Sequence, residues 1–508
     1  MEKEFICTVR EPVVDTQYGP VRGIKYDGIY AFKGIRYARA KRFRTPEPPQ
    51  SWSEPAPCFS YDCQCPQINP FSQEAELLIP HNIRPEDEQC HFINVWTPTL
   101  DENAKKTVMV WIHGGGFAIG SSHALVTYEG KNLAQAGDIV VVSVNHRLNW
   151  LGYLDVSSLG KQYENSVNAG MSDLVFALQW VKHNIAAFGG NPEDVTLFGQ
   201  SGGGEKIQAL MQTPEAEGLF HRAIIQSGVY DREETTPEER EKELDILLKK
   251  LGISKGRPDL LETAPYEAVT RVLLEMYGNG YLLHFGPQKN AWYYGDIRRE
   301  GLRPGAKPID LLVGSLFSEF NVPPVFDHGP RSHSWEDVRR ELTQKYGSTE
   351  KAEHIITLFR EAYPYRPPFW ACCLDPMFRW PTLQLADRMA KESRGKTYCY
   401  IMEFTLPVGE GLLARHNMDM PFTSHNTALV PCCNIPGVSD RLEKETSFAW
   451  IQFAKTGNPN HAALPTWKPY TTENKHCMSF SDVQTVCKPG FDYELARAIY
   501  DASHAYSL

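Results

Sequence analysis

The chain has 508 residues, of which 42% are hydrophobic and 22% are charged. This composition is typical of a globular protein and excludes disordered, fibrous and collagen-like chains. The formal net charge of -10 gives no general attraction to nucleic acid or to anionic membranes, so we expect neither as a partner. No stretch approaches the roughly 18 consecutive apolar residues of a membrane helix.

An alternation of strands and helices is predicted along the chain. Residues 107–113 and 138–145 are short apolar runs, and the second is apolar almost throughout, as expected of a strand covered on both faces. Residues 173–188 carry apolar side chains at helical spacing. This order indicates an α/β protein with a mostly parallel central sheet flanked by helices. Further strands are predicted at 194–199, 222–226, 308–314 and 397–404.

Two stretches interrupt this alternation. Residues 235–261 and 334–362 are rich in Glu and Lys at helical spacing, so both are predicted to be helical insertions outside the sheet. They either cover an active site or have no gating role.

A nucleophile motif follows the strand predicted at 194–199. Gly199, Ser201 and Gly203 form a G-x-S-x-G pattern, and helix formers follow from Glu205. Glycine is needed on both sides because the nucleophile sits on a sharp, strained turn, where a Cβ would collide with neighbouring backbone. The pattern occurs by chance about 0.15 times in a chain of this composition. The strand before it and the helix after it therefore carry the prediction.

A glycine run ends the strand predicted at 107–113. His113 is followed by Gly114, Gly115 and Gly116, and consecutive glycines let the backbone approach a ligand closely. A tetrahedral acyl-transfer intermediate carries an oxyanion that preorganised N–H groups must meet. Taken alone, the run also fits a simple strand-to-loop turn, but the serine motif about 85 residues downstream favours the catalytic interpretation.

These motifs are part of a longer set of ordered strings, through which the chain resembles the type-B carboxylesterases, the carboxylesterase and cholinesterase branch of the α/β-hydrolases. The resemblance implies one α/β-hydrolase domain over residues 1–508, with helical insertions near the active site. It also implies that Ser201 is the nucleophile and that the N–H groups of Gly115, Gly116 and Gly202 form the oxyanion hole. The strings are FKGIRYA (32–38), FINVWTP (92–98), VNHRL (144–148), FGGNP (188–192), FHRAIIQSG (220–228) and FAKTGNP (453–459).

The resemblance also supplies the two partners that a serine nucleophile needs, a base to take its proton and an acid to orient the base. Glu319 follows the strand predicted at 308–314, where the family places its acid. The segment that begins at His416 resembles the family's His-x-x-Asp/Glu-Leu-Pro. We therefore predict Glu319 as the orienting acid and His416 as the general base, with Asp327 and His425 as the alternatives.

Several positions depart from the family pattern. Gln200 precedes the nucleophile where relatives usually carry glutamate. An amide keeps the shape of that acid without its charge, so we expect the working pKa of His416 to be lower than with glutamate. The acid limb of the pH–rate profile should therefore lie at lower pH. A neutral packing substitution is the alternative. Ser227 either hydrogen-bonds the catalytic acid, as in relatives, or is a plain turn serine. Around the acid, the usual Asn, Asp and Gly are replaced by Leu316, Ser318 and Phe320.

The cysteines indicate a reducing compartment. Cys65 and Cys90 fall where many secreted relatives have a disulfide, but acidic residues at 2 and 4 stand where a signal peptide needs a basic region. We therefore expect a cytoplasmic protein in which both are thiols. Cys63 and Cys65 have no second pair at zinc spacing, so no metal site is expected.

Aromatic residues beside the catalytic segments favour an apolar pocket for an aryl or alkyl ester, although large aromatics near a sheet edge are more often simple core. Choline esters are not expected as preferred substrates, because the loop from Cys65 to Cys90 contains no Trp to hold a quaternary ammonium, as the cholinesterase relatives do. The candidate pocket residues are Phe117, Trp150, Phe317 and Trp370, with Phe369 and Phe378 beside them.

We therefore expect an intracellular serine carboxylesterase that forms an acyl-enzyme with small-molecule esters and uses neither a metal nor an organic cofactor. The same apparatus also serves amidases, thioesterases and acyltransferases. Outside the enzymes, the alternative is a non-catalytic cholinesterase-like binding protein, which usually lacks triad residues; here Ser201, Glu319 and His416 are all present. A monomer or weak homo-oligomer is expected.

Overall fold

The computed structural model describes residues 4–68, 77–232, 234–322, 333–409 and 411–504. The chain divides into two compact units. Unit 1 comprises Met1–Ser72, His81–Ala223 and Arg232–Ala306, and unit 2 comprises Gln73–Pro80, Ile224–Asp231 and Lys307–Leu508. The single domain over residues 1–508 stays a prediction.

Unit 1 contains a large sheet and a small one. In the large sheet, the strands at 106–112, 140–144 and 190–200 are parallel to one another, and the other neighbouring strands pair antiparallel. The small sheet joins β2 (Val13–Thr16), β3 (Gly19–Arg22) and β6 (Ala56–Pro57). The strands of the large sheet, in spatial order, are β1 (Phe5–Ile6), β4 (Ile24–Tyr26), β5 (Ile29–Arg36), β7 (Phe92–Thr97), β9 (Val140–Val144), β8 (Lys106–Ile112) and β10 (Gly190–Gln200).

The register of β8 and β10 decides where the predicted motifs lie. Trp111 pairs with Phe198, and Ile112 pairs with Gly199, so the two parallel strands end at the same edge of the sheet. Every residue of β9 and all but the first of β8 are buried, as predicted for strands covered on both faces. The glycine run after β8 and the serine after β10 therefore leave the sheet side by side.

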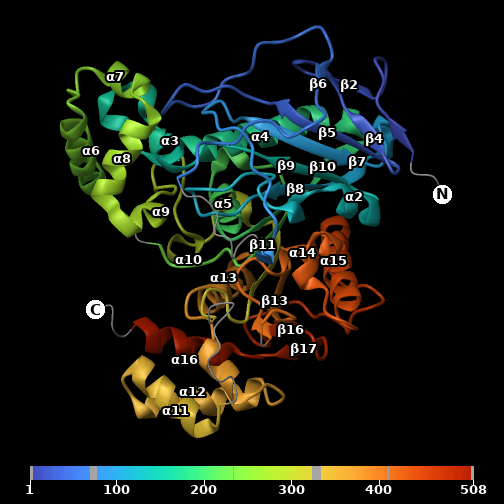
Figure 1. The fold of residues 1–508 in the computed structure, drawn as a ribbon, viewed down its shortest axis with the longest axis vertical. Helices are drawn as coiled ribbons and strands as arrows, with labels where there is room; N and C mark the ends of the chain where they lie inside the picture. Colours follow the sequence, from blue (N-terminus) through green and yellow to red (C-terminus); the bar gives the residue numbers. More distant parts are fainter. Residues whose placement is uncertain (1–3, 69–76, 233, 323–332, 410, 505–508) are drawn as a thin grey trace. The chain divides into compact units, whose positions relative to one another are not determined.

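Helices of unit 1 both flank its sheet and form a separate group. α4 and α5 contact β10, whereas α6, α7 and α8 lie together beside the strands (Figure 1). The predicted helix at 173–188 is α4, which begins at Ala169. The helices are α2 (Lys131–Gly137), α3 (Asn149–Tyr153), α4 (Ala169–Asn184), α5 (Gly202–Met211), α6 (Pro237–Leu251), α7 (Pro258–Thr263), α8 (Tyr266–Tyr277), α9 (Tyr281–His284) and α10 (Ile297–Glu300).

The helical insertion predicted at 235–261 is two helices rather than one. Thr236 and Glu239 form a reciprocal capping box at the start of α6, with the Glu239 N–H donating to the Thr236 hydroxyl at 3.2 Å. Gly252 directly follows the last residue of α6, and its φ of +69° lies in the left-handed region that glycine adopts without strain. The chain then turns before α7 begins.

Unit 2 contains a second set of parallel strands. β11 (Arg222–Gln226) begins with two residues of unit 1, and its last three residues belong to unit 2. β12 (Asp310–Leu316), β13 (Thr397–Glu403) and β16 (His476–Ser481) are parallel neighbours, and β17 (Val486–Pro489) closes the edge antiparallel. β14 (Thr405–Leu406) and β15 (Leu412–Leu413) form a short hairpin. The predicted strands at 222–226, 308–314 and 397–404 correspond to β11, β12 and β13, and the predicted α/β class is confirmed.

The helices of unit 2 pack on these strands and on one another. The insertion predicted at 334–362 is split at Gly347, whose φ is +62°, into α11 and α12, which pack on each other, while α12 also packs on α16. The helices are α11 (Trp335–Tyr346), α12 (Thr349–Ala362), α13 (Arg379–Glu392), α14 (Met420–Thr423), α15 (Ser439–Thr456) and α16 (Tyr493–His504).

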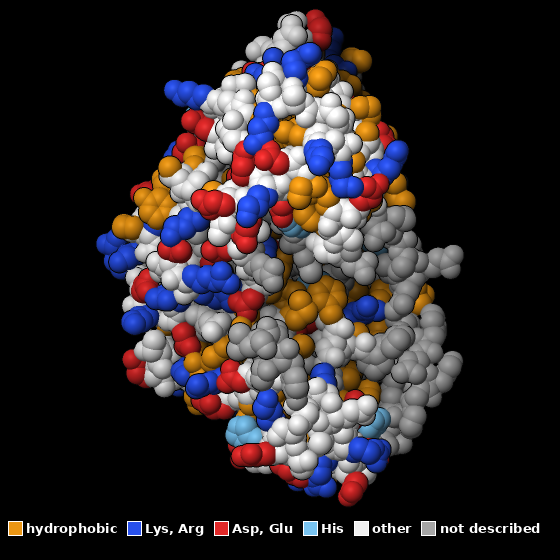
Figure 2. Space-filling view, turned by 90° about the vertical axis from the view of Figure 1, so that its left-hand side faces the viewer, with side chains coloured by type: hydrophobic (Ala, Val, Ile, Leu, Met, Phe, Trp, Pro, Cys, Tyr) orange, Lys and Arg blue, Asp and Glu red, His pale blue; other side chains and the backbone are white. Residues whose placement is uncertain are grey.

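Charged side chains of both signs are interspersed on the face shown in Figure 2. Exposed ion pairs also join neighbouring helices, for example Lys250 of α6 with Glu275 of α8 at 3.1 Å. Within the described ranges, no helix is both long and apolar enough to cross a bilayer.

Candidate active site

The predicted nucleophile lies on a strained bend between a strand and a helix. β10 ends at Gln200 and α5 begins at Gly202, which leaves Ser201 at φ +55° and ψ -130°. Residues other than glycine rarely adopt this backbone conformation, and those that do so cluster at functional sites. Glycine at 203 is required because a Cβ there would lie 2.0 Å from the Ile112 carbonyl oxygen. The bend predicted from the sequence motif is confirmed.

The glycine run after β8 packs against this bend. Gly115 and Gly116 have φ values of +90° and +60°, which favour glycine. A Cβ built on Gly114 would lie 3.2 Å from the Cβ of Ser201, and one on Gly202 would lie 2.2 Å from the Gly116 carbonyl oxygen. The structure thus brings Gly115, Gly116 and Gly202 next to Ser201, while their role as oxyanion donors stays a prediction.

The predicted acid and base form a hydrogen-bonded pair in unit 2. The Glu319 side chain is fully buried after β12, and its Oε2 lies 2.6 Å from Nδ1 of His416. Its Oε1 accepts a hydrogen bond from the Leu316 N–H at 2.7 Å, which fixes the carboxylate. The main chains also meet, because the His416 N–H donates to the Glu319 carbonyl at 3.0 Å. Asp327, the alternative acid, lies outside the described residues, and His425 instead contacts Ser447 at 3.1 Å.

Two buried carboxylates near this pair were missed by sequence reasoning. Burial, reinforced by the charge of Glu319, raises the pKa of Asp375, whose carboxylate accepts N–H bonds from Phe378 and Arg379 at 2.7 Å. Burial likewise raises the pKa of Asp419 to about 6. Asp419 belongs to the segment that resembles the family's His-x-x-Asp, so that resemblance was an available signal; Asp375 lies in no motif.

Aromatic rings surround the imidazole of His416. The ring centroid of Phe320 lies 4.2 Å from that of His416, and the ring of Phe378 lies 5.0 Å away. Phe378 is buried, but Phe320 is 55% exposed. Phe320 stands at a position where the family usually has glycine, so this departure from the family pattern contacts the predicted base directly.

The four predicted pocket residues Phe117, Trp150, Phe317 and Trp370 are all buried. The indole N–H of Trp150 donates to the hydroxyl of Thr270 at 3.0 Å, so its polar atom is satisfied within the core. Phe317 and Trp370 pack on each other with ring centroids 5.0 Å apart. Their assignment to a substrate pocket stays a prediction.

The other sequence candidates lie in buried surroundings. Gln200 is 2% exposed. Ser227 has a φ of +46°, its N–H donates to Gly314, and within the described part of the chain its hydroxyl has no hydrogen-bond partner; the turn-serine interpretation fits this geometry. Cys65 and Cys90 are both free thiols. Burial and the hydrogen bond to Cys65 raise the pKa of the Cys90 thiol.

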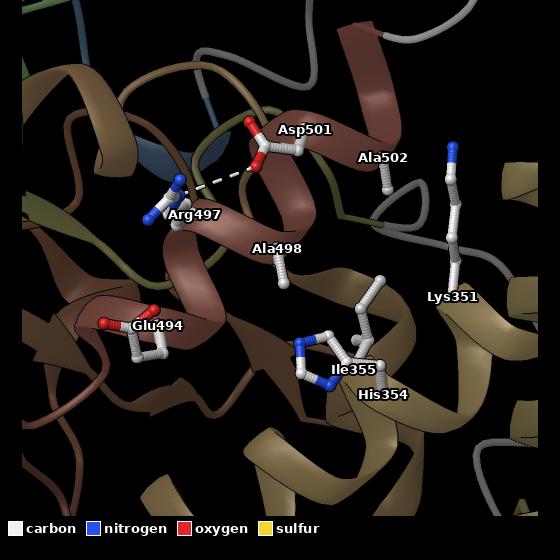
Figure 3. A pocket seen from close by; sticks show the side chains of 8 residues that line it. All are labelled: Lys351, His354, Ile355, Glu494, Arg497, Ala498, Asp501 and Ala502. Carbon is white, nitrogen blue, oxygen red and sulfur yellow. Dashed lines mark ion pairs between the residues drawn. The ribbon is translucent and has the colours of Figure 1, made fainter.

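A pocket of about 360 Å³ lies between α12 and α16 in unit 2 (Figure 3). None of the predicted site residues lines it, and Arg497 on its wall is ion-paired with Asp501 at 3.7 Å. We assign it no part in the reaction. Across the ranges that the structure describes, no cluster of three or more His, Cys, Asp or Glu side chains is arranged to hold a metal ion.

Known proteins match this chain over nearly its whole length. A family model described as the carboxylesterase family matches residues 10–494. Para-nitrobenzyl esterase of Bacillus subtilis (strain 168) is 31% identical over 487 residues, which cover 93% of this chain and 96% of that protein. Phenmedipham hydrolase of Pseudarthrobacter oxydans is 30% identical over 497 residues, with the same coverage of 93% and 96%.

A solved structure is similar in both sequence and fold. It is an esterase from anaerobic Clostridium hathewayi that can hydrolyze aliphatic aromatic polyesters. Its sequence is 40% identical, the TM-score is 0.92, and the match covers 99% of this chain and 100% of that one.

Proposed function

Because this chain belongs to the carboxylesterase family, and is therefore a carboxylic ester hydrolase with an α/β-hydrolase fold, we propose that it cleaves small-molecule esters through an acyl-enzyme on Ser201. The observation that carries the proposal is the 2.6 Å contact between Glu319 Oε2 and His416 Nδ1. A carboxylate on Nδ1 holds the imidazole in the tautomer whose Nε2 can take a proton from a serine.

The proposed reaction has two halves. The Ser201 oxygen attacks the ester carbonyl while His416 takes its proton, and the N–H groups of Gly115, Gly116 and Gly202 stabilise the oxyanion. His416 then gives the proton to the departing alcohol, and the acyl-enzyme remains. Water then gives a proton to the same imidazole and attacks the acyl carbonyl. The bond to the Ser201 oxygen breaks, His416 returns the proton to that oxygen, and the carboxylic acid is released. The Glu319 carboxylate stabilises the imidazolium that forms in each half.

We propose apolar aryl or alkyl esters as the substrate class. The exposed ring of Phe320 beside the imidazole supports this, because an aromatic surface at the reacting centre favours an apolar group on the substrate. The polyester activity named for the Clostridium hathewayi esterase points the same way. We also propose that the enzyme works in the cytoplasm.

The test is the turnover of p-nitrophenyl acetate, butyrate, octanoate and benzoate by the wild type and by Ser201→Ala. We expect hydrolysis by the wild type and a loss of about 10⁴-fold or more in kcat for the variant. Ser158→Ala, at an exposed position, is the control and should retain full activity. Equal rates from wild type and Ser201→Ala would overturn the mechanism.

Two additions sharpen this test. Phenylmethanesulfonyl fluoride should add one sulfonyl group to the wild type, on the peptide that contains Ser201, and none to Ser201→Ala. Thioester and anilide analogues of the best substrate should be hydrolysed more slowly than the ester. Acyl transfer to an added alcohol should also be slower than hydrolysis of the ester. A faster reaction with one of them would identify a thioesterase, amidase or acyltransferase instead.

A further inference from the structure

A buried lysine lies behind the glycine run. Lys206 is in the second turn of α5 and is 0% exposed. Its ammonium donates to the carbonyl oxygens of His113 at 3.1 Å and of Gly116 at 2.6 Å. It also lies over the ring of Phe117, 5.2 Å from the centroid. One side chain thus binds the backbone at two points, three residues apart.

No residue that the structure describes forms an ion pair with Lys206. Among the residues that the structure describes, its hydrogen bonds go to these two carbonyls. Burial lowers the pKa of Lys206 to about 7, and the charge of Glu205 opposes this shift. The stacked rings of His113 and His146 lie close by, and burial and the charge of Lys206 lower the pKa of both. Burying an ammonium without a carboxylate is unfavourable, so packing alone would favour an apolar side chain at this position.

The two carbonyls mark the two ends of the glycine run. The His113 carbonyl belongs to the peptide that enters Gly114, and the Gly116 carbonyl belongs to the peptide that leaves the run. Glycine has more backbone freedom than any other residue, so three in succession need an external restraint to hold one conformation. Gly202 contributes to this restraint, since its missing Cβ leaves room for the Gly116 carbonyl.

We propose that Lys206 is a positioning residue for ester hydrolysis: its side chain holds both ends of the Gly114–Gly116 run and thereby fixes the N–H groups of Gly115 and Gly116 toward the developing oxyanion. This inference rests on the proposed function, because it assigns those N–H groups to the oxyanion hole. The stabilisation of an oxyanion depends on donors that are already oriented before the reaction. A flexible run would bind the substrate but would stabilise the transition state less.

The experiment compares Lys206→Met with the wild type on the p-nitrophenyl ester that is turned over fastest. Methionine has an unbranched chain of similar length and no donor. We expect kcat to fall about 10- to 100-fold, less than the roughly 100- to 1,000-fold for loss of an oxyanion donor itself, with KM within about threefold. Affinity for a trifluoromethyl ketone, which forms a tetrahedral adduct with its own oxyanion, should fall by the same factor as kcat.

Lys182→Met is the matched control. Lys182 also donates to a backbone carbonyl, that of Gly218 at 3.1 Å, but its side chain is 38% exposed, and its loss should change neither kcat nor ketone affinity. The thermal midpoint of Lys206→Met should equal or exceed that of the wild type, because the variant buries no charge. A purely structural role would instead lower the midpoint and leave the kinetics of the folded fraction unchanged.

Folded Lys206→Met with kcat and ketone affinity within twofold of the wild type would overturn the inference. If this variant does not fold, Lys206→Gln decides: its shorter neutral amide should lower kcat and ketone affinity together, and wild-type values would refute the positioning role. Ser201→Ala separates the two proposals. Turnover by Ser201→Ala contradicts the proposed function, whereas an inactive Ser201→Ala beside a fully active Lys206 variant contradicts only the inference.

Discussion

Replacement of Asp419 by asparagine should change the pH dependence of stability in a calculable way. The Asp419 carboxylate is fully buried, and its Oδ2 accepts a hydrogen bond from Gln226 at 2.8 Å. Among the described residues, its Oδ1 has no hydrogen-bond partner. Burial raises its pKa from the ordinary 3.8 to about 6, with Glu319 adding to the rise and Gln226 and His416 opposing it.

The sign follows from proton binding. Between pH 3.8 and about 6 the folded protein holds this proton more tightly than the unfolded chain, so the ionised Asp419 destabilises the fold as pH rises. A shift of about 2 units at about 1.36 kcal/mol each corresponds to about 3 kcal/mol above pH 7. Of this penalty, about 1 kcal/mol develops between pH 5 and pH 8. Asparagine has no such titration, and any fixed cost of its amide is the same at both pH values.

The assay is urea-induced unfolding, followed by tryptophan fluorescence, of wild type and Asp419→Asn at pH 5 and pH 8. The stability of the variant relative to the wild type should increase by about 1 kcal/mol from the lower to the higher pH. Asp440→Asn, at an exposed position of α15, should show no such increase. A difference between Asp419→Asn and wild type that is the same at both pH values would refute a raised pKa at this site.

Three further predictions concern residues in unit 1. Arg147→Met should lower the free energy of unfolding by about 3–5 kcal/mol, because it leaves the buried Asp173 carboxylate without the 2.6 Å and 2.8 Å contacts of the guanidinium. Urea unfolding measures this loss, and the double variant with Asp173→Leu should recover part of it. A loss below about 1 kcal/mol in the single variant would contradict the prediction. Gln200→Glu should move the acid limb of the pH–rate profile to higher pH, since a nearby negative charge favours the protonated imidazole; an unmoved limb would contradict it. Oxidation by diamide should form a disulfide between Cys65 and Cys90, which mass spectrometry detects as the loss of two hydrogens. The disulfide should raise the free energy of unfolding by about 3–4 kcal/mol. Retention of both thiols would show that the pair cannot be bridged.

The local parts of the fold were predictable from the sequence. Continuous apolar runs gave β8, β9 and β13, because strands buried on both faces must be apolar throughout. The bend at Ser201 was predictable because its flanking glycines meet a steric requirement that the neighbouring strand imposes. The strands β1 and β4 were not predicted, since two or three residues are too few for a clear period. β5, whose apolar residues are interrupted by Lys33, Gly34 and Arg36, was also missed, as was β7.

Contacts between distant segments were harder to predict. The partnership of Glu319 and His416 came from family resemblance, not from local pattern, and Asp375 had no signal at all. Lys206 looked like an ordinary helix residue, because nothing local shows that its face of α5 is turned toward the end of β8. The position of Trp150 beside the catalytic segments predicts a pocket residue. Its indole N–H instead donates a hydrogen bond to the hydroxyl of Thr270, which lies 120 residues away in the chain.

The backbone bridge between Glu319 and Arg415 has a consequence for how the acid can be exchanged. Because the main chain of His416 is already tied to Glu319 through the 3.0 Å bond, placement of the imidazole does not depend on the carboxylate alone. Evolution or design can therefore alter the acid, or lose it, without first dismantling the segment that presents the base. A variant without the proposed acid would keep the imidazole in place but would no longer fix its tautomer or stabilise its charge. A carboxylate introduced on a neighbouring side chain could then restore activity.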